Sequence, residues 1–159
     1  MARSKCKIEG FDGVDRLFKQ ISRPQEFCEV AINEAAPILL KATKASVRKA
    51  IDNPPSARKT EPERTGQLER SFMATKAKTN QYGTFATIQP VGSRSDKTTG
   101  GKPLHYAAQA AFLEWGTKNG QAPSPFRKRA INDAGDECAR TMEKAFLREV
   151  GKHWTVEEG

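Results

Sequence analysis

Residues 68–91 read LERSFMATKAKTNQYGTFATIQPV, two extended segments on either side of a short polar turn. In residues 68–78 and again in residues 82–91, successive side chains alternate between two faces, as in a β-strand. Residues 79–81, Thr-Asn-Gln, join the two segments, so the pattern predicts a β-hairpin. Because an isolated hairpin is barely stable in water, we expect it to pair with further strands or to lie on helices.

The chain before this hairpin has a helical pattern. Residues 10–21 predict a short amphipathic helix, and residues 24–51 predict a long one with Pro24 in its first turn. Pro37 falls inside the long helix and is expected to kink it or split it in two. The apolar stripe of the short helix consists of Val14, Leu17, Phe18 and Ile21. The expected inner face of the long helix consists of Phe27, Val30, Ala31, Ile38, Ala42, Ala45 and Lys49.

Two further helices are expected after the hairpin. Residues 104–115 are rich in alanine and predict a short helix, which Gly116 ends because glycine enters a left-handed cap without penalty. Ser124 suits the N-cap, and Pro125 the first turn, of a last helix that runs to about Val150. Its apolar stripe is expected at Phe126, Ala130, Ala134, Cys138, Met142, Ala145 and Phe146.

These elements predict a single α+β domain over residues 1–159, with amphipathic helices packed on a small antiparallel β-sheet. The ordered core is expected at about residues 10–150. Residues 52–64, rich in proline, and residues 92–103, rich in glycine, are expected to form mobile loops. Residues 151–159 are expected to form a loose tail.

Composition narrows the class of protein. Hydrophobic residues make up 36% and charged residues 29%, which is typical of a globular domain. The net charge of +8 favours contact with nucleic acid or with acidic protein surfaces and does not choose between them. No apolar run approaches the roughly 20 residues of a membrane span, and no apolar segment follows the basic start, so neither a membrane span nor a secretory signal is expected.

Cysteine and histidine spacing gives no sign of a disulfide framework or a metal site. The three cysteines lie far apart, which fits a reducing cytoplasm, and Cys28 and Cys138 fall in apolar helical patterns where burial is expected. His105 and His153 have no second ligand at metal-binding spacing. The nucleophile-elbow, zinc-protease and phosphate-loop motifs do not occur. We therefore expect no catalytic residue, no metal and no cofactor.

Three short segments stand out by their order and spacing: Thr65-Gly66-Gln67-Leu68-Glu69-Arg70-Ser71, then Tyr106-Ala107 with Phe112-Leu113-Glu114-Trp115-Gly116-Thr117, then Pro123-Ser124-Pro125-Phe126-Arg127-Lys128-Arg129-Ala130. This ordered set resembles the tail-completion, or head–tail joining, proteins of long-tailed bacteriophages and prophages. In that family a TGxLxxS turn opens a β-region, and a helix ending in (F/V)E(F/W)GT precedes a helix that starts with PxPF. The resemblance covers nearly the whole chain, although the family more often has an aliphatic residue where this chain has Arg127.

The resemblance implies a structural protein of the virion neck, made in the host cytoplasm and not an enzyme. It implies a homo-oligomeric ring, with a hexamer as one stoichiometry, or a monomer that assembles only on its partner. The implied partners are the connector or adaptor protein and the tail-tube or tail-terminator protein. The residues that would shape the fold and the ring interface are Thr65, Gly66, Leu68, Ser71, Tyr106, Phe112, Glu114, Trp115, Gly116, Thr117, Pro125 and Phe126.

The motif side chains carry two structural expectations. Glu114 lies near the C-terminal end of its predicted helix, where negative charge is unfavourable. We expect it to bind an arginine or the first N–H groups of the last helix. Tyr106, Phe112 and Trp115 are spaced as core aromatics, and the alternative is that they stack on nucleic-acid bases.

Two basic clusters leave a second function open. Each suits a solvated helix face, an acidic partner surface or transient contact with DNA phosphates. A basic DNA-binding module is therefore the alternative to the neck protein, and its affinity would fall steeply with salt. A small nuclease is a third hypothesis, but it needs clustered carboxylates, whereas those of this chain are scattered. The clusters are Lys41, Lys44, Arg48 and Lys49, and Arg127, Lys128 and Arg129.

Overall fold

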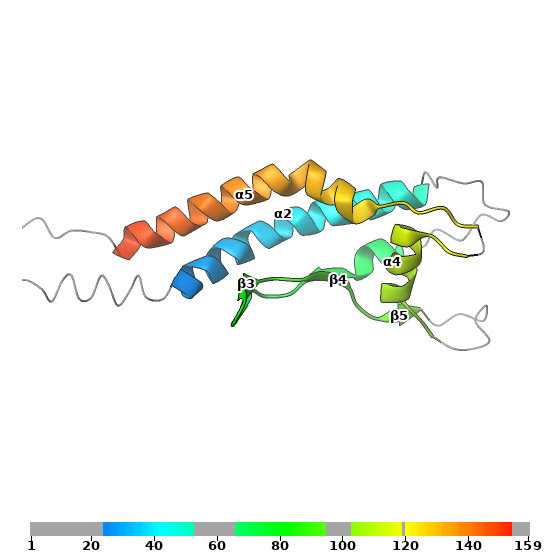
Figure 1. Cartoon of the computed structure of the whole chain (residues 1–159), viewed down its shortest axis with the longest axis horizontal. Helices are drawn as coiled ribbons and strands as arrows, with labels where there is room; N and C mark the ends of the chain where they lie inside the picture. Colours follow the sequence, from blue (N-terminus) through cyan, green and yellow to red (C-terminus); the bar gives the residue numbers. More distant parts are fainter. Residues whose placement is uncertain (1–23, 53–65, 95–102, 119, 154–159) are drawn as a thin grey trace, which may run out of the picture.

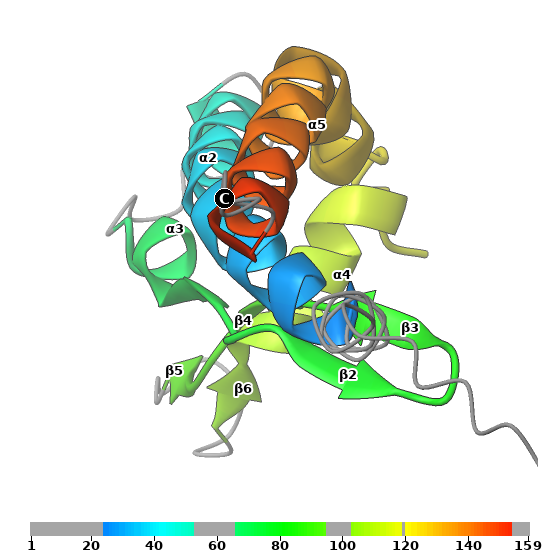
Figure 2. The same ribbon diagram turned by 90° about the vertical axis from the view of Figure 1, so that its left-hand side faces the viewer.

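The computed structural model describes residues 24–52, 66–94, 103–118 and 120–153. Two long helices, α2 (Pro24–Asp52) and α5 (Phe126–His153), lie side by side and antiparallel, and short strands and helices cover the other side of α2 (Figures 1 and 2). This arrangement confirms the α+β fold class. The expected helix over residues 10–21 and the residues beyond 153 lie outside the described ranges, as do residues 53–64 and 95–102 of the two expected loops.

The short elements follow one another between the long helices. The helices are α3 (Gln67–Ser71) and α4 (Tyr106–Trp115). The strands are β1 (Phe72–Ala74), β2 (Lys78–Asn80), β3 (Gly83–Phe85), β4 (Ile88–Pro90), β5 (Ser93–Arg94) and β6 (Leu104–His105). They pair antiparallel as β1 with β4, β2 with β3 and β5 with β6.

Helix α2 runs through Pro37 without interruption, so of the two expected outcomes, a kink or a split, the split does not occur. A proline inside a helix removes one backbone hydrogen bond, but packing on both sides of a helix can offset that loss. Pro37 is exposed, and its neighbours Ala35, Ile38 and Leu39 pack against α5 near Ala134 and Cys138. The contacts with α5 therefore stabilise the helix on both sides of Pro37.

The second half of α2 turns a different face inward from the one expected. Thr43, Ser46, Val47 and Ala50 are buried there, whereas Ala45 and Lys49 are exposed. The two buried hydroxyls are satisfied, because Thr43 Oγ1 donates to the Leu39 carbonyl at 2.8 Å and Ser46 Oγ donates to the Phe126 carbonyl at 2.9 Å. An apolar pattern alone misses this face, since its polar members are buried with their partners.

Strands β1 to β4 form one hairpin that is interrupted by a β-bulge. Phe72 pairs with Pro90 and Ala74 with Ile88, and beyond the interruption Lys78 pairs with Phe85. Residues 75–77 therefore face only residues 86–87, which leaves one extra residue on the first strand, as in a bulge. The hairpin expectation is confirmed, but its turn lies at residues 81–82, between the paired Asn80 and Gly83, instead of residues 79–81.

The bulge attaches the hairpin to α2. The backbone N–H of Ala77, inside the bulge, donates to Asn33 Oδ1 at 2.8 Å. Next to it, Thr79 Oγ1 donates to Glu29 Oε1 at 2.7 Å. A bulge leaves backbone groups without ladder partners, and here a side chain of α2 accepts the hydrogen bond from one of them.

Four boundary expectations are wrong. Residues 68–71 lie in helix α3 instead of a strand, and residues 104–105 form strand β6 instead of the first turn of α4. Residues 93–94, expected in a loop, pair with that strand. The last helix extends to His153, so residues 151–153 do not belong to a loose tail. Short elements are set by tertiary contacts more than by local propensity, which explains why the errors cluster there.

Candidate assembly interface

The three motif segments converge at one end of the α2–α5 pair. A buried cluster joins α2, β1, α4 and the start of α5, and Leu68 of α3 packs against it. The rings of Phe72 and Phe126 meet edge to face, with centroids 5.7 Å apart. Both rings are almost fully buried. We call this region the junction; its buried residues are Val47, Ala50, Phe72, Ala110, Leu113 and Phe126.

The first motif segment builds α3 on the rim of the junction. Gly66 has φ of +66°, a left-handed conformation that favours glycine, and its carbonyl accepts from Arg70 N at 3.1 Å. Ser71 Oγ donates to the Leu68 carbonyl at 2.7 Å. The Tyr106 hydroxyl donates to Gln67 Oε1 at 3.1 Å, which links α3 to the start of α4. Thr65 lies outside the described residues.

Gly116 ends α4 as expected. Its N–H donates to the Phe112 carbonyl at 2.9 Å and its φ is +78°. A Cβ at this position would lie 2.5 Å from the Gln121 carbonyl oxygen, so only glycine fits the turn. Thr117 closes the same turn, because its N–H donates to the Gln121 carbonyl at 2.9 Å.

Glu114 joins the second and third motif segments. Its side chain is buried, and Oε2 accepts a hydrogen bond from the backbone N–H of Arg127 at 3.1 Å. The expectation that Glu114 binds the first N–H groups of the last helix is confirmed. A carboxylate is favourable there, since a helix N-terminus carries unpaired N–H groups and a partial positive charge.

The Ser124 side chain has a different role from the expected one. Its hydroxyl oxygen accepts from Arg129 Nη2 at 2.9 Å, and its backbone N–H donates to the Leu113 carbonyl at 2.8 Å. Arg129 Nε also donates to Ser46 Oγ at 3.4 Å. Pro125 directly precedes α5, whose first turn receives its carboxylate from Glu114.

Two motif aromatics are exposed, so the expectation that they lie in the core is wrong. Trp115 is 67% exposed and Phe112 is 45% exposed, whereas Tyr106 is half-buried. Helix α4 is short, and it buries only Ala110, Leu113 and Glu114. The Arg127 guanidinium lies 5.6 Å from the Trp115 ring centroid, within the range of a cation–π contact. We call Phe112, Trp115 and Arg127 the Trp115 patch.

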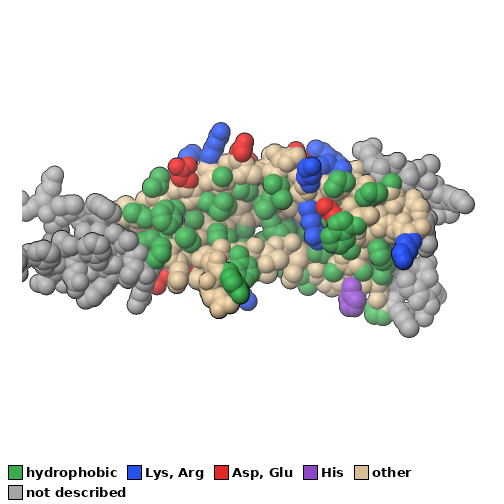
Figure 3. Space-filling view, viewed as in Figure 1, with side chains coloured by type: hydrophobic (Ala, Val, Ile, Leu, Met, Phe, Trp, Pro, Cys, Tyr) green, Lys and Arg blue, Asp and Glu red, His purple; other side chains and the backbone are tan. Residues whose placement is uncertain are grey.

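The expected basic clusters are only partly available to a partner. On α2, Lys41, Arg48 and Lys49 are exposed and Lys44 is half-buried, and Arg48 lies 3.9 Å from Asp52. On α5, Arg127 and Lys128 are exposed, whereas the half-buried Arg129 binds Ser46 and Ser124. Figure 3 shows Lys and Arg side chains over the start of α5, beside a hydrophobic patch.

An apolar groove of about 310 Å³ continues from the Trp115 patch. Helix α2 forms its floor, α5 and the hairpin form its walls, and Arg127 belongs to both the groove and the patch. Figure 3 looks onto this face, where hydrophobic side chains gather between α5 and the strands. The remaining lining residues are Ile32, Ala35, Ala36, Leu39, Thr43, Phe72, Ala86, Ile88, Ala130, Ile131, Cys138 and Met142.

Sequence reasoning missed the groove. Ile131 is 58% exposed and lies beside the buried stripe of α5, next to Ala130. An apolar residue that widens a helix stripe at its edge is the signal that points to such a surface. Burial is the main reason that the pKa of the Cys138 thiol is raised. The thiol therefore stays neutral and contributes an apolar side chain to the groove.

Residues 24–52, 66–94, 103–118 and 120–153 contain no group of three His, Cys, Asp or Glu side chains that could hold a metal ion. Among the helices of these ranges, none combines the length and apolar character that crossing a bilayer requires.

Comparison of the chain with protein-family models, with curated proteins and with solved structures finds no match.

Proposed function

We propose that this chain is a structural protein of the head–tail junction of a long-tailed phage or prophage, a tail-completion or neck subunit without catalytic residues. The observation that carries the proposal is the convergence of the three motif segments. Segments far apart in sequence meet through the Tyr106–Gln67 and Glu114–Arg127 hydrogen bonds, and Leu68 of the first segment packs against the junction. Such a set of motif residues supports a role in positioning a binding surface rather than in catalysis.

The surface held in this way is suited to protein contact. Tryptophan and arginine are enriched among the residues that dominate binding energy at interfaces. In the Trp115 patch, Arg127 at the start of α5 lies against Trp115 at the end of α4. The inner face of α4 is anchored in the junction. Because α4 is already packed on the junction through Ala110 and Leu113, a partner that binds there need not order the helix first. Under the proposal, the neighbouring ring of the neck binds this patch.

A genetic experiment tests the proposal. Deleting the gene from the phage or prophage genome that carries it should leave filled heads and separate tails that do not join, as seen by electron microscopy. The wild-type gene supplied in trans should restore joined particles. A Trp115→Ala variant should fail to restore them, whereas Tyr82→Ala should succeed, because Tyr82 is 88% exposed at the hairpin tip, away from the patch. Joined particles in the deletion strain would overturn the proposal.

A basic DNA-binding module is the second candidate, favoured by the net charge of +8 and by the exposed Arg127 and Lys128. If several phosphates were neutralised, binding to duplex DNA would weaken about 10³-fold or more between 50 and 200 mM salt. A titration at both salt concentrations separates the candidates. Tight and strongly salt-dependent binding by the isolated chain would favour the DNA-binding module over the neck protein.

A further inference from the structure

We propose that the apolar groove binds residues 10–21 of a second copy of this chain, so that neighbouring copies join by exchanging N-terminal segments. The inference rests on the proposed function, since it names the contact by which neck subunits would associate. Its physical basis is a groove without a described occupant and an amphipathic segment of matching length and character.

The groove is long enough for a short helix. Its floor on α2 extends from Ile32 to Thr43, which corresponds to about 17 Å of helix. A helix of residues 10–21 would be about 18 Å long. Its walls are almost wholly apolar, and Ile131 on its α5 side is 58% exposed. An apolar groove of this kind is suited to the apolar face of an amphipathic helix.

The N-terminal segment has the complementary surface. Its apolar residues, Val14, Leu17, Phe18 and Ile21, fall on one helical face and are unfavourable in water unless covered. Asp12 and Asp15 lie in its first half. Among the described residues that line the groove, Arg127 carries the charge. Opposite charges therefore favour an orientation in which the start of the segment lies near Arg127.

The short link to α2 favours a second copy over the segment's own chain. Only Ser22 and Arg23 separate the segment from Pro24. A segment that folded back along its own α2 would have its midpoint about 13 Å from Pro24, whereas the middle of the groove lies about 20 Å from Pro24. The segment of another copy has no such restraint and can fill the groove. A head-to-tail contact of this type can close a ring.

The test is the mass of the full chain in solution, measured by light scattering behind a sizing column over a concentration series. The wild type should form species at multiples of 17.6 kDa. Leu17→Asp with Phe18→Asp should weaken association at least about tenfold, as should Ile131→Asp, because each places a charge in the apolar contact. Leu147→Asp is the matched control, since Leu147 is 59% exposed on the same helix and does not line the groove.

Mixing the variants identifies the exchange itself. The segment variant retains an intact groove and the groove variant retains an intact segment, so an equal mixture should form a two-chain species that neither variant forms alone. A monomeric wild type, association unaffected by the segment variant, or a mixture that stays monomeric would each overturn the inference. If these results occurred while the gene deletion still left heads and tails unjoined, the proposed function would stand without the exchanged segment.

Discussion

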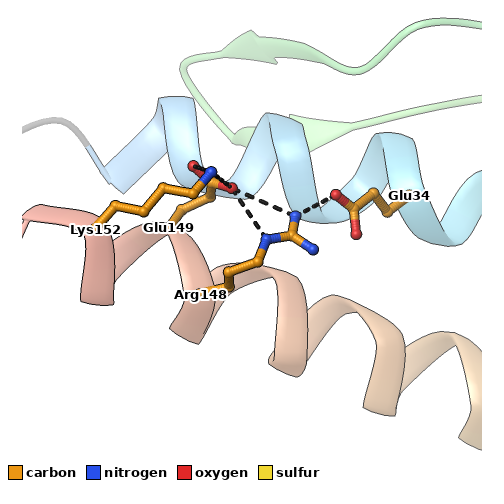
Figure 4. Close-up of polar contacts among 4 residues, drawn as sticks. All are labelled: Glu34, Arg148, Glu149 and Lys152. Atoms are coloured by element: carbon orange, nitrogen blue, oxygen red, sulfur yellow. Dashed lines mark hydrogen bonds and ion pairs between the residues drawn. The ribbon is translucent and has the colours of Figure 1, made fainter.

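The two ends of the α2–α5 pair are held together by different kinds of contact. At the junction, buried rings and backbone hydrogen bonds fix α5 against α2 and α4. At the far end, Arg148 of α5 pairs with Glu34 of α2 and with Glu149, and Lys152 Nζ lies 2.8 Å from Glu149 Oε1 (Figure 4). Arg148, Glu34 and Lys152 are 50%, 40% and 58% exposed, whereas Glu149 is 14% exposed.

Most of the stability of the fold is expected to come from the junction. Ion pairs with exposed partners add little to the free energy of unfolding, because water and salt screen them. Buried rings and buried polar groups with hydrogen-bond partners add more. The same helix pair is therefore expected to open from its far end, while the junction stays closed until the whole domain unfolds. Paired substitutions at the two ends test this asymmetry.

The largest expected difference comes from removing one aromatic ring at each end. Phe126→Ala should lower the free energy of unfolding by about 3–5 kcal/mol, the usual cost of deleting a fully buried ring. Phe146→Ala should cost clearly less, because Phe146 is half-buried and its only described ring contact is an edge-to-face one with Phe27 at 6.2 Å. Urea unfolding measures both values. Equal costs would remove the asymmetry.

A glycine substitution at each end should act in opposite directions. Gly116→Ala should destabilise the fold by about 1–3 kcal/mol or more, since it forces a side chain into a glycine-only conformation and against the Gln121 carbonyl. Gly151→Ala should stabilise it by up to about 1 kcal/mol, because Gly151 lies inside α5 with nothing near the added methyl group. Thermal melting of both variants beside the wild type gives the signs. A Gly116→Ala variant as stable as the wild type would contradict the geometry of the turn.

Glu114→Gln should cost about 1–2 kcal/mol, because an amide keeps the acceptor oxygen but loses the charge that interacts with the start of α5. Glu143→Gln is the control, since Glu143 is an exposed carboxylate in the middle of α5, away from the start of that helix. Unfolding at low and high salt should show the Glu114 effect persisting, because a buried contact is screened little. Unchanged stability of the Glu114 variant would mean that the cap contributes nothing.

The smallest expected effect is at the far end and depends on pH. The hydrogen bond from Lys152, with the charge of that residue and of Arg148, lowers the pKa of the Glu149 carboxyl. Its contribution is therefore fully present above the unfolded value of about 4.3 and is lost as the pH falls through the lower folded value. The melting temperature of Glu149→Gln should be slightly below that of the wild type at pH 7 and should equal it in acid. A difference that grew on acidification would contradict the ion-pair geometry.

The sequence predicted the elements with regular patterns well. The stripe of α5, the hairpin, the end of α4 at Gly116 and the partner of Glu114 all follow from local rules. The inner face of α2 was missed because its buried hydroxyls are satisfied by Leu39 and by Phe126, far along the chain. Exposure of Trp115 was missed because spacing indicates which side chains share a face, but not whether anything covers that face.

The single extra residue in the bulge at residues 75–77 also determines which way the side chains of the hairpin tip point. Side chains on a strand alternate, so removing a single residue there would restore an even ladder and reverse every side chain between the deletion and the turn. Thr79, which contacts Glu29 in this structure, would then point away from α2, and the residues before and after it in the strand would point toward α2. Insertions or deletions in pairs would preserve that parity. Among natural variants of this chain, we therefore expect length changes in the hairpin tip to come in twos, while those in the connections between elements follow no such rule.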